Sequence, residues 1–420
     1  MPSIAARIYW RKALSPILLL DLDDTLLQNN IDDFLPHYLG AFSKKASTYL
    51  DPDRFVKSLL AGTRAMVDNR QPDRTLKESF DATFFPLTGV DVNSFQALAE
   101  QFYAEVFPTL RSLTKPIPKA VQLVNDAQEK GYRLVVATNP LFPRTAILQR
   151  LAWADLPADR YSYEIITSYE TFHFTKPDPA YYAEIMARMG WPTELAVVVG
   201  DDLERDIYAG RQLGLPAYWI GQSDKMPVNG ADAPSQAGGI DELILWLEKA
   251  PPETLQAGYN SPTAWLAILR STQAGLDGFS RSLEGIDWAA RPQQDEWSLT
   301  EVLCHLRDVD QEVNIPRLQK VLAESNPFLP GEDTDRWAEV RQYCFQDGPE
   351  ALHQFIATRS EMVSLLQTLA AEDWQRPARH AIFGPTRLQE LVSITAAHDR
   401  VHMGQVYELL KQVAPATLVQ

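Results

Sequence analysis

Near the start of the chain, an apolar run leads into a cluster of carboxylates: Ile17-Leu18-Leu19-Leu20-Asp21-Leu22-Asp23-Asp24-Thr25. The run predicts a strand that is buried on both faces, because its apolar residues do not alternate with polar ones. Ligands of open α/β sheets collect beyond the carboxyl ends of the strands. Asp21 and Asp23 therefore lie where such a sheet would carry out its chemistry, and both can face the site once the chain turns.

Four similar apolar runs follow in the first half of the chain, with helical patterns between them. Residues 120–130 and 179–189 are two of the expected helices, and each is followed by a glycine, a common helix end. This alternation predicts a doubly wound, Rossmann-like α/β fold with a parallel sheet. The five expected strands are residues 16–22, 132–138, 163–167, 195–200 and 217–220.

One interval between strands is too long for a simple crossover. Residues 28–116 show helical periodicity and no convincing strand. We therefore expect a helical insertion directly after the first strand, inside a core made of residues 13–27 and 117–248. Amphipathic helices are expected within the insertion at residues 34–49, 53–67 and 93–106.

The composition changes after residue 248. Residues 249–260 are rich in proline and glycine and predict a linker. Beyond the linker the strand pattern vanishes and four long helical stretches follow. Ser298 and Glu301 have the spacing of a capping box at the start of the second stretch. Residues 261–413 are therefore expected to form an all-α four-helix bundle.

Charge and cysteine content exclude several classes of protein. The chain has 39 Lys and Arg against 55 Asp and Glu, a formal net charge of −16, so it lacks the basic footprint of nucleic-acid binding. The two cysteines, Cys304 and Cys344, cannot build a disulfide framework and fit a reducing cytosol. Residues 1–12 have no signal-peptide core and 17–20 are too short to span a membrane. A cytoplasmic protein without membrane or nucleic-acid partners is expected.

The later strands also end in side chains that suit phosphate chemistry. A hydroxyl and an amide follow the second strand, an ammonium follows the third, and three carboxylates follow the fourth. These are Thr138 and Asn139, then Lys176, then Asp201, Asp202 and Asp206. A single Asp-x-Asp could be a helix cap or a solvated turn, but four strand ends that meet in one crevice favour catalysis.

These four motifs, in this order, resemble those of the haloacid dehalogenase-like (HAD) superfamily over roughly the first 248 residues. The resemblance implies that Asp21 is the nucleophile that forms an aspartyl-phosphate, and that Asp23 is first the acid and then the base. It implies that Thr138 and Lys176 stabilise the transferring phosphoryl group. Asn139 is able to hold phosphate oxygens beside them.

The resemblance also implies a magnesium site. Mg²⁺ would be held by Asp21, the backbone carbonyl of Asp23, and Asp201, because this hard cation prefers oxygen ligands. Asp206 completes the last motif, expected in the second shell, and Asp202 could share that duty. The sequence does not separate the two.

The presence of Asp23 narrows the reaction within the superfamily. It disfavours carbon–halogen hydrolysis, since a halide needs no proton on leaving. Phosphomonoester hydrolysis of a small phosphorylated metabolite is expected, while a phosphomutase stays open. So does a phosphonatase, which would use an insertion lysine, namely Lys44, Lys45 or Lys57. The insertion matches the family's helical cap, which closes over the site. Possible substrate contacts, each more often a plain surface residue, are His37, Arg64, Arg70 and Arg74; His173 stands near the rim.

The last helix carries two histidines four residues apart, His398 and His402. They fall within an apolar stripe from 388 to 410 that includes Ile394 and Val401, so both rings are expected to point into the bundle. His305 borders the apolar face of the second helix. Three histidines from facing helices could bind a transition metal with one position left open. Gln405, one turn past His402, could contact a ligand water or the site wall.

The stretches 298–305 and 398–405 resemble the DinB-like family of four-helix metal proteins, and the likeness spans about residues 255–413. It implies a divalent metal, zinc or nickel in character, and in some members chemistry on low-molecular-weight thiols. A zincin protease is a weak rival, because Asp399 stands in place of its glutamate and no third ligand follows. Cys304 points about 100° away from His305 on a helix and is expected to pack rather than ligate.

Other roles for the bundle stay open. It could serve only in binding or in homodimer formation, or sense a ligand that regulates the HAD half. It could instead be the main enzyme, a metal- and thiol-dependent transferase or hydrolase.

Overall fold

The computed structural model describes residues 16–222, 225–226, 233–334 and 336–418. Contacts divide these residues into two compact units. The first comprises the described residues up to 181 together with 193–258, and the second comprises 182–192 together with those from 259 onward. The expected absence of a signal peptide from residues 1–12 concerns a segment outside the described residues, as does the expected start of the core at residue 13.

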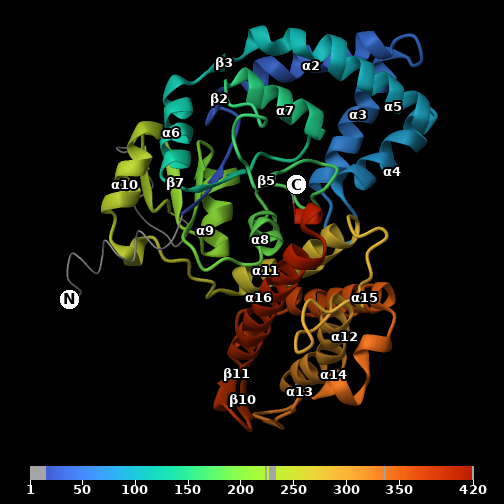
Figure 1. Cartoon of the computed structure of the whole chain (residues 1–420), viewed down its shortest axis with the longest axis vertical. Helices are drawn as coiled ribbons and strands as arrows, with labels where there is room; N and C mark the ends of the chain where they lie inside the picture. The colour runs from blue at the N-terminus through green and yellow to red at the C-terminus, as the bar shows by residue number, and fades with distance from the viewer. Residues whose placement is uncertain (1–15, 223–224, 227–232, 335, 419–420) are drawn as a thin grey trace. The chain divides into compact units, whose positions relative to one another are not determined.

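The first unit is built around a six-stranded parallel sheet in the order β5-β4-β1-β6-β7-β8. Figure 1 labels two of these strands, β5 and β7. β1 lies in the interior of the sheet, pairs with β4 and β6, and has four fully buried residues, as its unbroken apolar run predicts. The expected doubly wound α/β fold is confirmed. The strands are β1 (Ile17–Leu20), β4 (Arg133–Val136), β5 (Ile165–Ile166), β6 (Ala196–Gly200), β7 (Ala217–Ile220) and β8 (Gln236–Gly238).

Helices connect successive strands of this sheet from β1 to β7. The sequence does not predict β8, because Gln236-Ala237-Gly238 contains no apolar run. This strand pairs with Tyr218–Ile220 of β7. The connecting helices are α6 (Pro118–Glu129), α7 (Arg144–Trp153), α8 (Pro179–Arg188), and the π-helical turn η3 (Leu203–Tyr208) with α9 (Ala209–Leu213). Residues 182–188 of α8 are grouped by their contacts with the second unit. After β8 the chain continues through η5 (Ile240–Glu242) and α10 (Leu243–Lys249). A short turn, η6 (Pro252–Thr254), follows in the expected linker.

The insertion between β1 and β4 is helical, as expected, but contains more structure than its periodicity indicates. Its elements are α2 (Ile31–Ala46), α3 (Pro52–Val67), α4 (Leu76–Thr88), α5 (Val92–Gln101), η1 (Phe102–Val106) and η2 (Phe107–Leu113). α4 was not predicted; Pro86 interrupts its pattern, although Thr75 and Glu78 form a capping box at its start. The expectation of no strand is wrong, because β2 (Leu27–Gln28) pairs with β3 (Lys115–Pro116) where the insertion begins and ends. These strands have only two residues each.

The second unit is a helical bundle, which confirms the expected architecture. Its helices are α11 (Pro262–Ser280), α12 (Leu299–Val309) continued by η7 (Asp310–Asn314) and α13 (Ile315–Ala323), then α14 (Trp337–Val340), η8 (Tyr343–Phe345), α15 (Gly348–Gln367), η9 (Asp373–Gln375), α16 (Leu388–Val413) and η10 (Pro415–Leu418). The expected capping box is present: the backbone N–H of Glu301 donates to Ser298 Oγ, and that of Ser298 to the Glu301 carboxylate.

Two expectations for this unit are wrong. Strands do occur, since β9 (Phe328–Leu329), β10 (Pro377–His380) and β11 (Gly384–Arg387) form a small sheet. They have only two to four residues each, and β10 and β11 mix apolar with polar residues, so none shows an apolar run long enough to predict a strand. On α16, Ile394 and Val401 lie outside the buried stripe, with exposed fractions of 41% and 69%, while Asp399 between the two histidines is fully buried. A buried charge partner, described below, makes this placement of a carboxylate possible.

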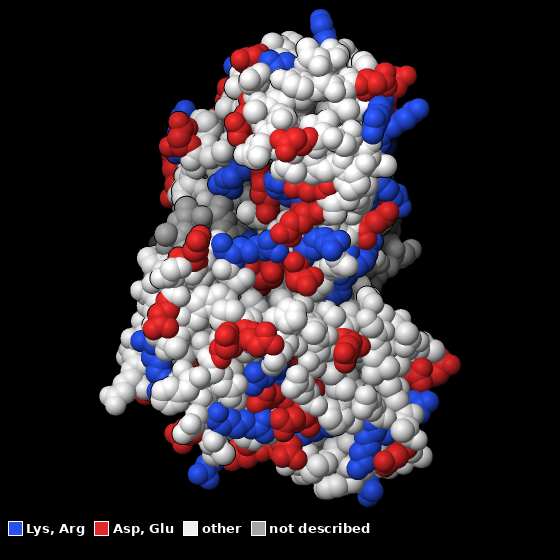
Figure 2. Space-filling model, turned by 90° about the vertical axis from the view of Figure 1, so that its right-hand side faces the viewer, with Lys and Arg blue, Asp and Glu red and all other residues white. Residues whose placement is uncertain are grey.

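Within the described residues, no helix is long and apolar enough to cross a membrane. On the face drawn in Figure 2, acidic and basic side chains are interspersed, so the excess of negative charge is not gathered into one patch there.

Candidate active site and metal centre

The ends of β1 and β6 bring three carboxylates together. The backbone N–H of Asp21 donates to the Val199 carbonyl at 2.9 Å, which aligns the two strand ends. One carboxylate oxygen from each of Asp21, Asp201 and Asp206 lies within 4.8 Å of the others. Asp21 and Asp206 are buried, and Asp201 is half-buried. Three converging carboxylates are a donor set that fits a hard divalent cation such as Mg²⁺.

Lys176 lies between two of these carboxylates. Its Nζ is 2.7 Å from Asp21 Oδ1 and 2.5 Å from Asp206 Oδ1, and the side chain is almost completely buried. Its backbone N–H donates to Asn139 Oδ1 at 3.3 Å. The structure therefore brings together residues from four separate strand ends.

Burial, together with the neighbouring carboxylates, raises the pKa values of two of these groups. Burial, followed by the charges of Asp21 and Asp206, raises the pKa of Asp201 to about 7. Burial also raises the pKa of Asp206 to about 7, against the opposing effect of the Lys176 ammonium. Extra positive charge here would favour the ionised carboxylates, which is again what a divalent cation supplies.

The geometry separates Asp202 from Asp206, which the sequence does not. Asp202 is the N-cap of η3, and its carboxylate accepts from the backbone N–H groups of Glu204 and Arg205 at 2.9 Å. Asp206 points the other way and accepts from the backbone N–H of Asp202 at 3.2 Å. Asp206 thus belongs to the carboxylate cluster itself, while Asp202 is a helix cap.

Asp23 faces a different set of partners. Asn29 Nδ2 donates to Asp23 Oδ1 at 2.8 Å, and the guanidinium of Arg150 contacts the same oxygen. Arg150 is 1% exposed and comes from α7. Burial lowers its pKa to about 10, against the opposing charge of Asp21. Sequence analysis missed Arg150 because it belongs to no motif; a charged residue on the apolar side of a helix is the one available signal.

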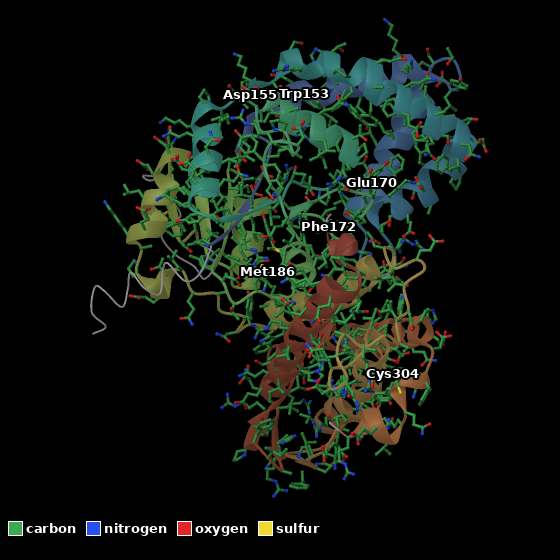
Figure 3. The ribbon with its side chains drawn as sticks, viewed as in Figure 1. Trp153, Asp155, Glu170, Phe172, Met186 and Cys304 are labelled. Atoms are coloured by element: carbon green, nitrogen blue, oxygen red, sulfur yellow. The ribbon has the colours of Figure 1, made fainter. Side chains whose placement is uncertain are left out.

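The start of α7 is held by Glu170, which lies in the segment between β5 and α8 (Figure 3). Both of its carboxylate oxygens accept from the backbone N–H of Arg144 at 3.0 Å. Acidic groups stabilise helix N-termini, so this contact fixes the helix that carries Arg150.

Thr138 is buried, and its backbone is well anchored. The Thr138 carbonyl accepts from Thr167 Oγ1 at 2.8 Å and from the Tyr181 hydroxyl at 2.7 Å. The end of β4 is therefore held rigidly next to the Lys176 segment.

Several insertion residues that the sequence offers as substrate contacts or as a phosphonatase lysine have local partners. His37 Nδ1 bonds to the Asp33 carbonyl at 2.7 Å, and the exposed Arg64 pairs with Asp68 at 2.6 Å. Lys45 pairs with Glu105 at 2.9 Å. Lys44, Lys57 and Arg74 are exposed, whereas His173 is fully buried. Arg70 comes nearest to a motif, with its Nε 3.9 Å from Asp178 Oδ2.

In the second unit, three histidines converge as their spacing predicts. His398 Nε2 lies 3.1 Å from His305 Nε2 and 3.0 Å from His402 Nε2. Two nitrogens bound to one tetrahedral zinc at about 2.0–2.1 Å would lie about 3.3 Å apart. His398 therefore lies at close to the separation that a metal requires from each of the other two histidines, and a nitrogen from each of the three rings lies within 4.8 Å of the others.

Neighbouring side chains orient the histidines. Gln405 Oε1 accepts from His402 Nδ1 at 2.9 Å, which leaves the Nε2 lone pair toward the cluster. Trp297 stacks on the His402 ring, with centroids 6.1 Å apart. Burial, followed by the neighbouring histidines, lowers the pKa values of His305 and His398 to about 3. Neutral imidazoles are the form that binds metals.

Two further residues are excluded from this centre. Asp399 turns away into a buried ion pair with Arg359 of α15, which also bonds to Asp310 at 2.6 Å, so Asp399 is not placed as a zincin base. Cys304, seen on α12 in Figure 3, is buried, and its Sγ lies 3.4 Å from Gln346 Oε1. It packs beside the helix, as predicted, and burial raises its pKa to about 11.

Comparisons with known proteins found relatives that each match a part of the chain. A phosphoglycolate phosphatase of Agrobacterium fabrum is 27% identical over 211 residues, 50% of this chain and 82% of that protein. The uncharacterised protein YuaE of Bacillus subtilis is 20% identical over 137 residues, 30% of this chain and 85% of YuaE. The structure of YfiT from Bacillus subtilis, described as an unusual four-helix bundle, matches 37% of this chain and 89% of its own at 19% identity and a TM-score of 0.33.

Matches to family models agree with the resemblance of the first half to haloacid dehalogenase-like proteins, with that of the second half to DinB-like proteins, and with the expectation of a hydrolase. Residues 16–214 match the haloacid dehalogenase-like hydrolase family, and residues 268–406 match the DinB superfamily. The chain therefore joins a haloacid dehalogenase-like hydrolase domain to a DinB-superfamily domain.

Proposed function

We propose that the first unit is a Mg²⁺-dependent phosphatase that hydrolyses small phosphate monoesters through an aspartyl-phosphate on Asp21. The observation that carries the proposal is the buried contact between Asp21 and Lys176, beside the carboxylates of Asp201 and Asp206. The matched phosphoglycolate phosphatase supports a phosphorylated small molecule as substrate.

Asp21 and Asp23 divide the chemistry between them. A carboxylate oxygen of Asp21 bonds to phosphorus while the bond from phosphorus to the alcohol oxygen breaks, and Asp23 gives that oxygen a proton. Asp23 then takes a proton from a water molecule, whose oxygen bonds to phosphorus and releases Asp21. Asn29 and Arg150 hold the Asp23 carboxyl group in place for both steps.

The other residues stabilise charge. The Lys176 ammonium offsets the negative charge that gathers around Asp21 and the phosphoryl oxygens, while Thr138 and Asn139 hold those oxygens. Mg²⁺, when bound, supplies positive charge at the transferring group. It would be held by the carboxylates of Asp21, Asp201 and Asp206 and by the backbone carbonyl of Asp23. We assign residues 28–116 as a cap that covers this site and excludes bulk water.

Phosphate release with Mg²⁺ from a panel of phosphomonoesters tests this proposal. Asp21→Asn should abolish turnover because an amide is a poor nucleophile toward phosphorus. Asp202→Asn is the matched control, since an asparagine still caps η3, and it should keep wild-type activity. Equal activity of Asp21→Asn and wild type would refute the mechanism. Transfer of phosphate to a second sugar position, without free phosphate, would indicate a mutase instead.

For the second unit we propose a divalent transition-metal centre at His305, His398 and His402, with one coordination position left for a ligand. The convergence of the three Nε2 atoms carries this proposal. Metal content measured on the purified chain after zinc or nickel loading tests it. His398→Ala should lose the metal, whereas the exposed His353→Ala should keep it. Stoichiometric metal in both variants would refute the site.

Turnover of a low-molecular-weight thiol by the metal-loaded chain would show that this centre is an enzyme in its own right. Unchanged phosphatase activity on metal removal from the histidines would show that it does not regulate the first unit.

A further inference from the structure

A pocket of about 460 Å³ lies within the second unit, between the first turn of α11, the β10–β11 hairpin and the first two turns of α16. This volume is in the range of small-molecule sites. None of the three histidines of the proposed metal centre lines it. Its apolar lining comes from two aromatic rings, two prolines and one isoleucine, namely Trp265, Phe383, Pro262, Pro385 and Ile394. The pocket is therefore a separate candidate site for a ligand that has an apolar body.

The two aromatic rings are held in place by their neighbours. Trp265 is 6% exposed, and its Nε1 donates to the Tyr259 carbonyl at 2.8 Å, so the ring offers the pocket apolar surface rather than a donor. Phe383 is 55% exposed, but its ring stacks on that of His380, with centroids 4.7 Å apart. His380 Nδ1 also accepts from the backbone N–H groups of Ile382 and Phe383 at 3.2 and 3.4 Å. The hairpin thus preorganises an exposed ring to contact a ligand.

Glu390 is the one charged side chain among the described residues that line the pocket. Its Oε2 accepts from the backbone N–H of Arg387 at 2.7 Å and from Thr386 Oγ1 at 3.3 Å, which fixes the direction of the carboxylate. Its Oε1 has no hydrogen bond, and the group has no ion pair, within the described part of the chain. The guanidinium of Arg387 donates instead to Gln375 Oε1 at 2.7 Å. The pocket therefore carries an uncompensated negative charge beside aromatic carbon.

An organic ammonium ion matches both of these features. Aromatic faces attract cations through their quadrupole, and a carboxylate oxygen accepts a charge-assisted hydrogen bond from an ammonium N–H. A bare metal ion matches less well, because one carboxylate supplies too few oxygen ligands. An anion would be repelled by Glu390. The net charge of −16 on the whole chain also attracts cations.

We propose that this pocket binds a small organic ammonium ion, with its apolar body against Trp265 and Phe383 and its positive charge at Glu390 Oε1. None of the described lining residues belongs to the proposed Mg²⁺ site or to the histidine site. The ammonium ion is therefore a ligand distinct from the phosphate ester and from the transition metal.

Saturation-transfer NMR on the full chain at pH 7 tests the proposal with 2-phenylethylammonium, 2-phenylethanol and phenylacetate, which are similar in size and differ in charge. The Kd of the ammonium should be at least about fivefold lower than that of the alcohol, as expected for a cation–π contact with an exposed ion pair. Phenylacetate should bind most weakly. Glu390→Gln should make the first two Kd values equal, and a glutamine still closes the capping box of α16. Glu361→Gln, which removes an exposed carboxylate elsewhere in the unit, should keep the wild-type ratio.

The aromatic contact has its own pair of variants. Phe383→Ala should weaken the binding of both the ammonium and the alcohol several-fold, because it removes surface that the apolar body covers. Phe345→Ala removes a ring that is 83% exposed and does not line the pocket, so it should change neither Kd. A lower mass of Phe383→Ala than of wild type in analytical ultracentrifugation would show that a second copy of the chain fills the pocket, and would overturn the proposal.

Several results of the NMR titrations would also overturn it. These are the absence of binding by any probe, equal Kd values for all three in the wild type, tightest binding of phenylacetate, and a preference for the ammonium that survives Glu390→Gln. Binding that His398→Ala abolishes and Glu390→Gln leaves intact would place the ligand at the histidine centre instead. If Glu390→Gln does not fold, raising NaCl from about 0.02 to about 0.5 M should bring the two Kd values of the wild type close together, and an unchanged ratio overturns the role of Glu390.

Discussion

Lowering the pH from 8 to 6 should weaken Mg²⁺ binding to the first unit steeply. The carboxyl groups of Asp201 and Asp206 have pKa values of about 7, because burial and neighbouring carboxylates disfavour their ionised forms. Both must lose their protons to bind the cation, so Mg²⁺ competes with protons near neutral pH.

The size of the effect follows from these pKa values. If both groups titrate near 7, the fully ionised pair makes up roughly 80% of molecules at pH 8, roughly 25% at pH 7 and under about 1% at pH 6. The apparent Kd should therefore rise about threefold from pH 8 to 7, and about thirtyfold from pH 7 to 6. About one proton should leave per Mg²⁺ at pH 7, and nearly two at pH 6.

Isothermal titration calorimetry in PIPES and in imidazole, which differ in ionisation enthalpy, measures both the Kd and the released protons. Asp202→Asn should reproduce the wild-type profile, because Asp202 only caps η3. Asp206→Asn should bind more weakly and release no more than about one proton at pH 6. A Kd that is the same at pH 6 and 8, or heats that do not depend on the buffer, would show that these carboxyl groups are not the ligands.

Three further perturbations test other parts of the structure. Lys176→Met should lower kcat at least about a hundredfold while Mg²⁺ still binds, because it removes a preorganised charge; a smaller loss in steady-state kinetics would argue against that role. Arg359→Met should destabilise the second unit by about 3–5 kcal/mol, since it leaves two buried carboxylates uncompensated, and hydrogen exchange in α15 and α16 should show it. A triple variant that combines Arg359→Met with Asp310→Asn and Asp399→Asn no longer buries an unpaired charge, so it should regain part of the hydrogen-exchange protection. The metal-free second unit should lose thermal stability as the pH falls from about 6.5 toward 3, because folded His398 has a pKa of about 3 and binds fewer protons than the unfolded chain. His398→Ala should reduce this slope, and an unchanged slope would mean that the histidine does not titrate as described.

Much of the carboxylate site and of the histidine site can be predicted from the sequence, because regular secondary structure places their residues. Parallel strands bring their carboxyl ends to one edge, so side chains after β1, β4 and β6 meet whatever the loops between them do. Likewise, His398 and His402 share a helix face because they are four residues apart. For the two histidines the geometry of one helix determines the position, and for the strand ends the parallel pairing of the strands does.

Other features depend on contacts between distant segments. Asp202 and Asp206 lie within one turn, and only the direction of the backbone after β6 decides which one caps η3 and which one joins the carboxylates. Asp399 is buried while Val401 is exposed because Arg359, forty positions away, supplies the countercharge. Hydrophobicity alone predicts the opposite, namely a buried Val401 and an exposed Asp399.

The sequence by itself therefore determined the α/β and helical halves, the strand-end carboxylates and the histidine triad. The tertiary structure alone decided that Arg150 meets Asp23, that Asp399 is neutralised by Arg359, and that three short strands form the small sheet of the second unit. The physical reason is that periodicity and strand ends are properties of neighbouring residues. The stability of a buried charge depends instead on a partner that folding brings from elsewhere in the chain.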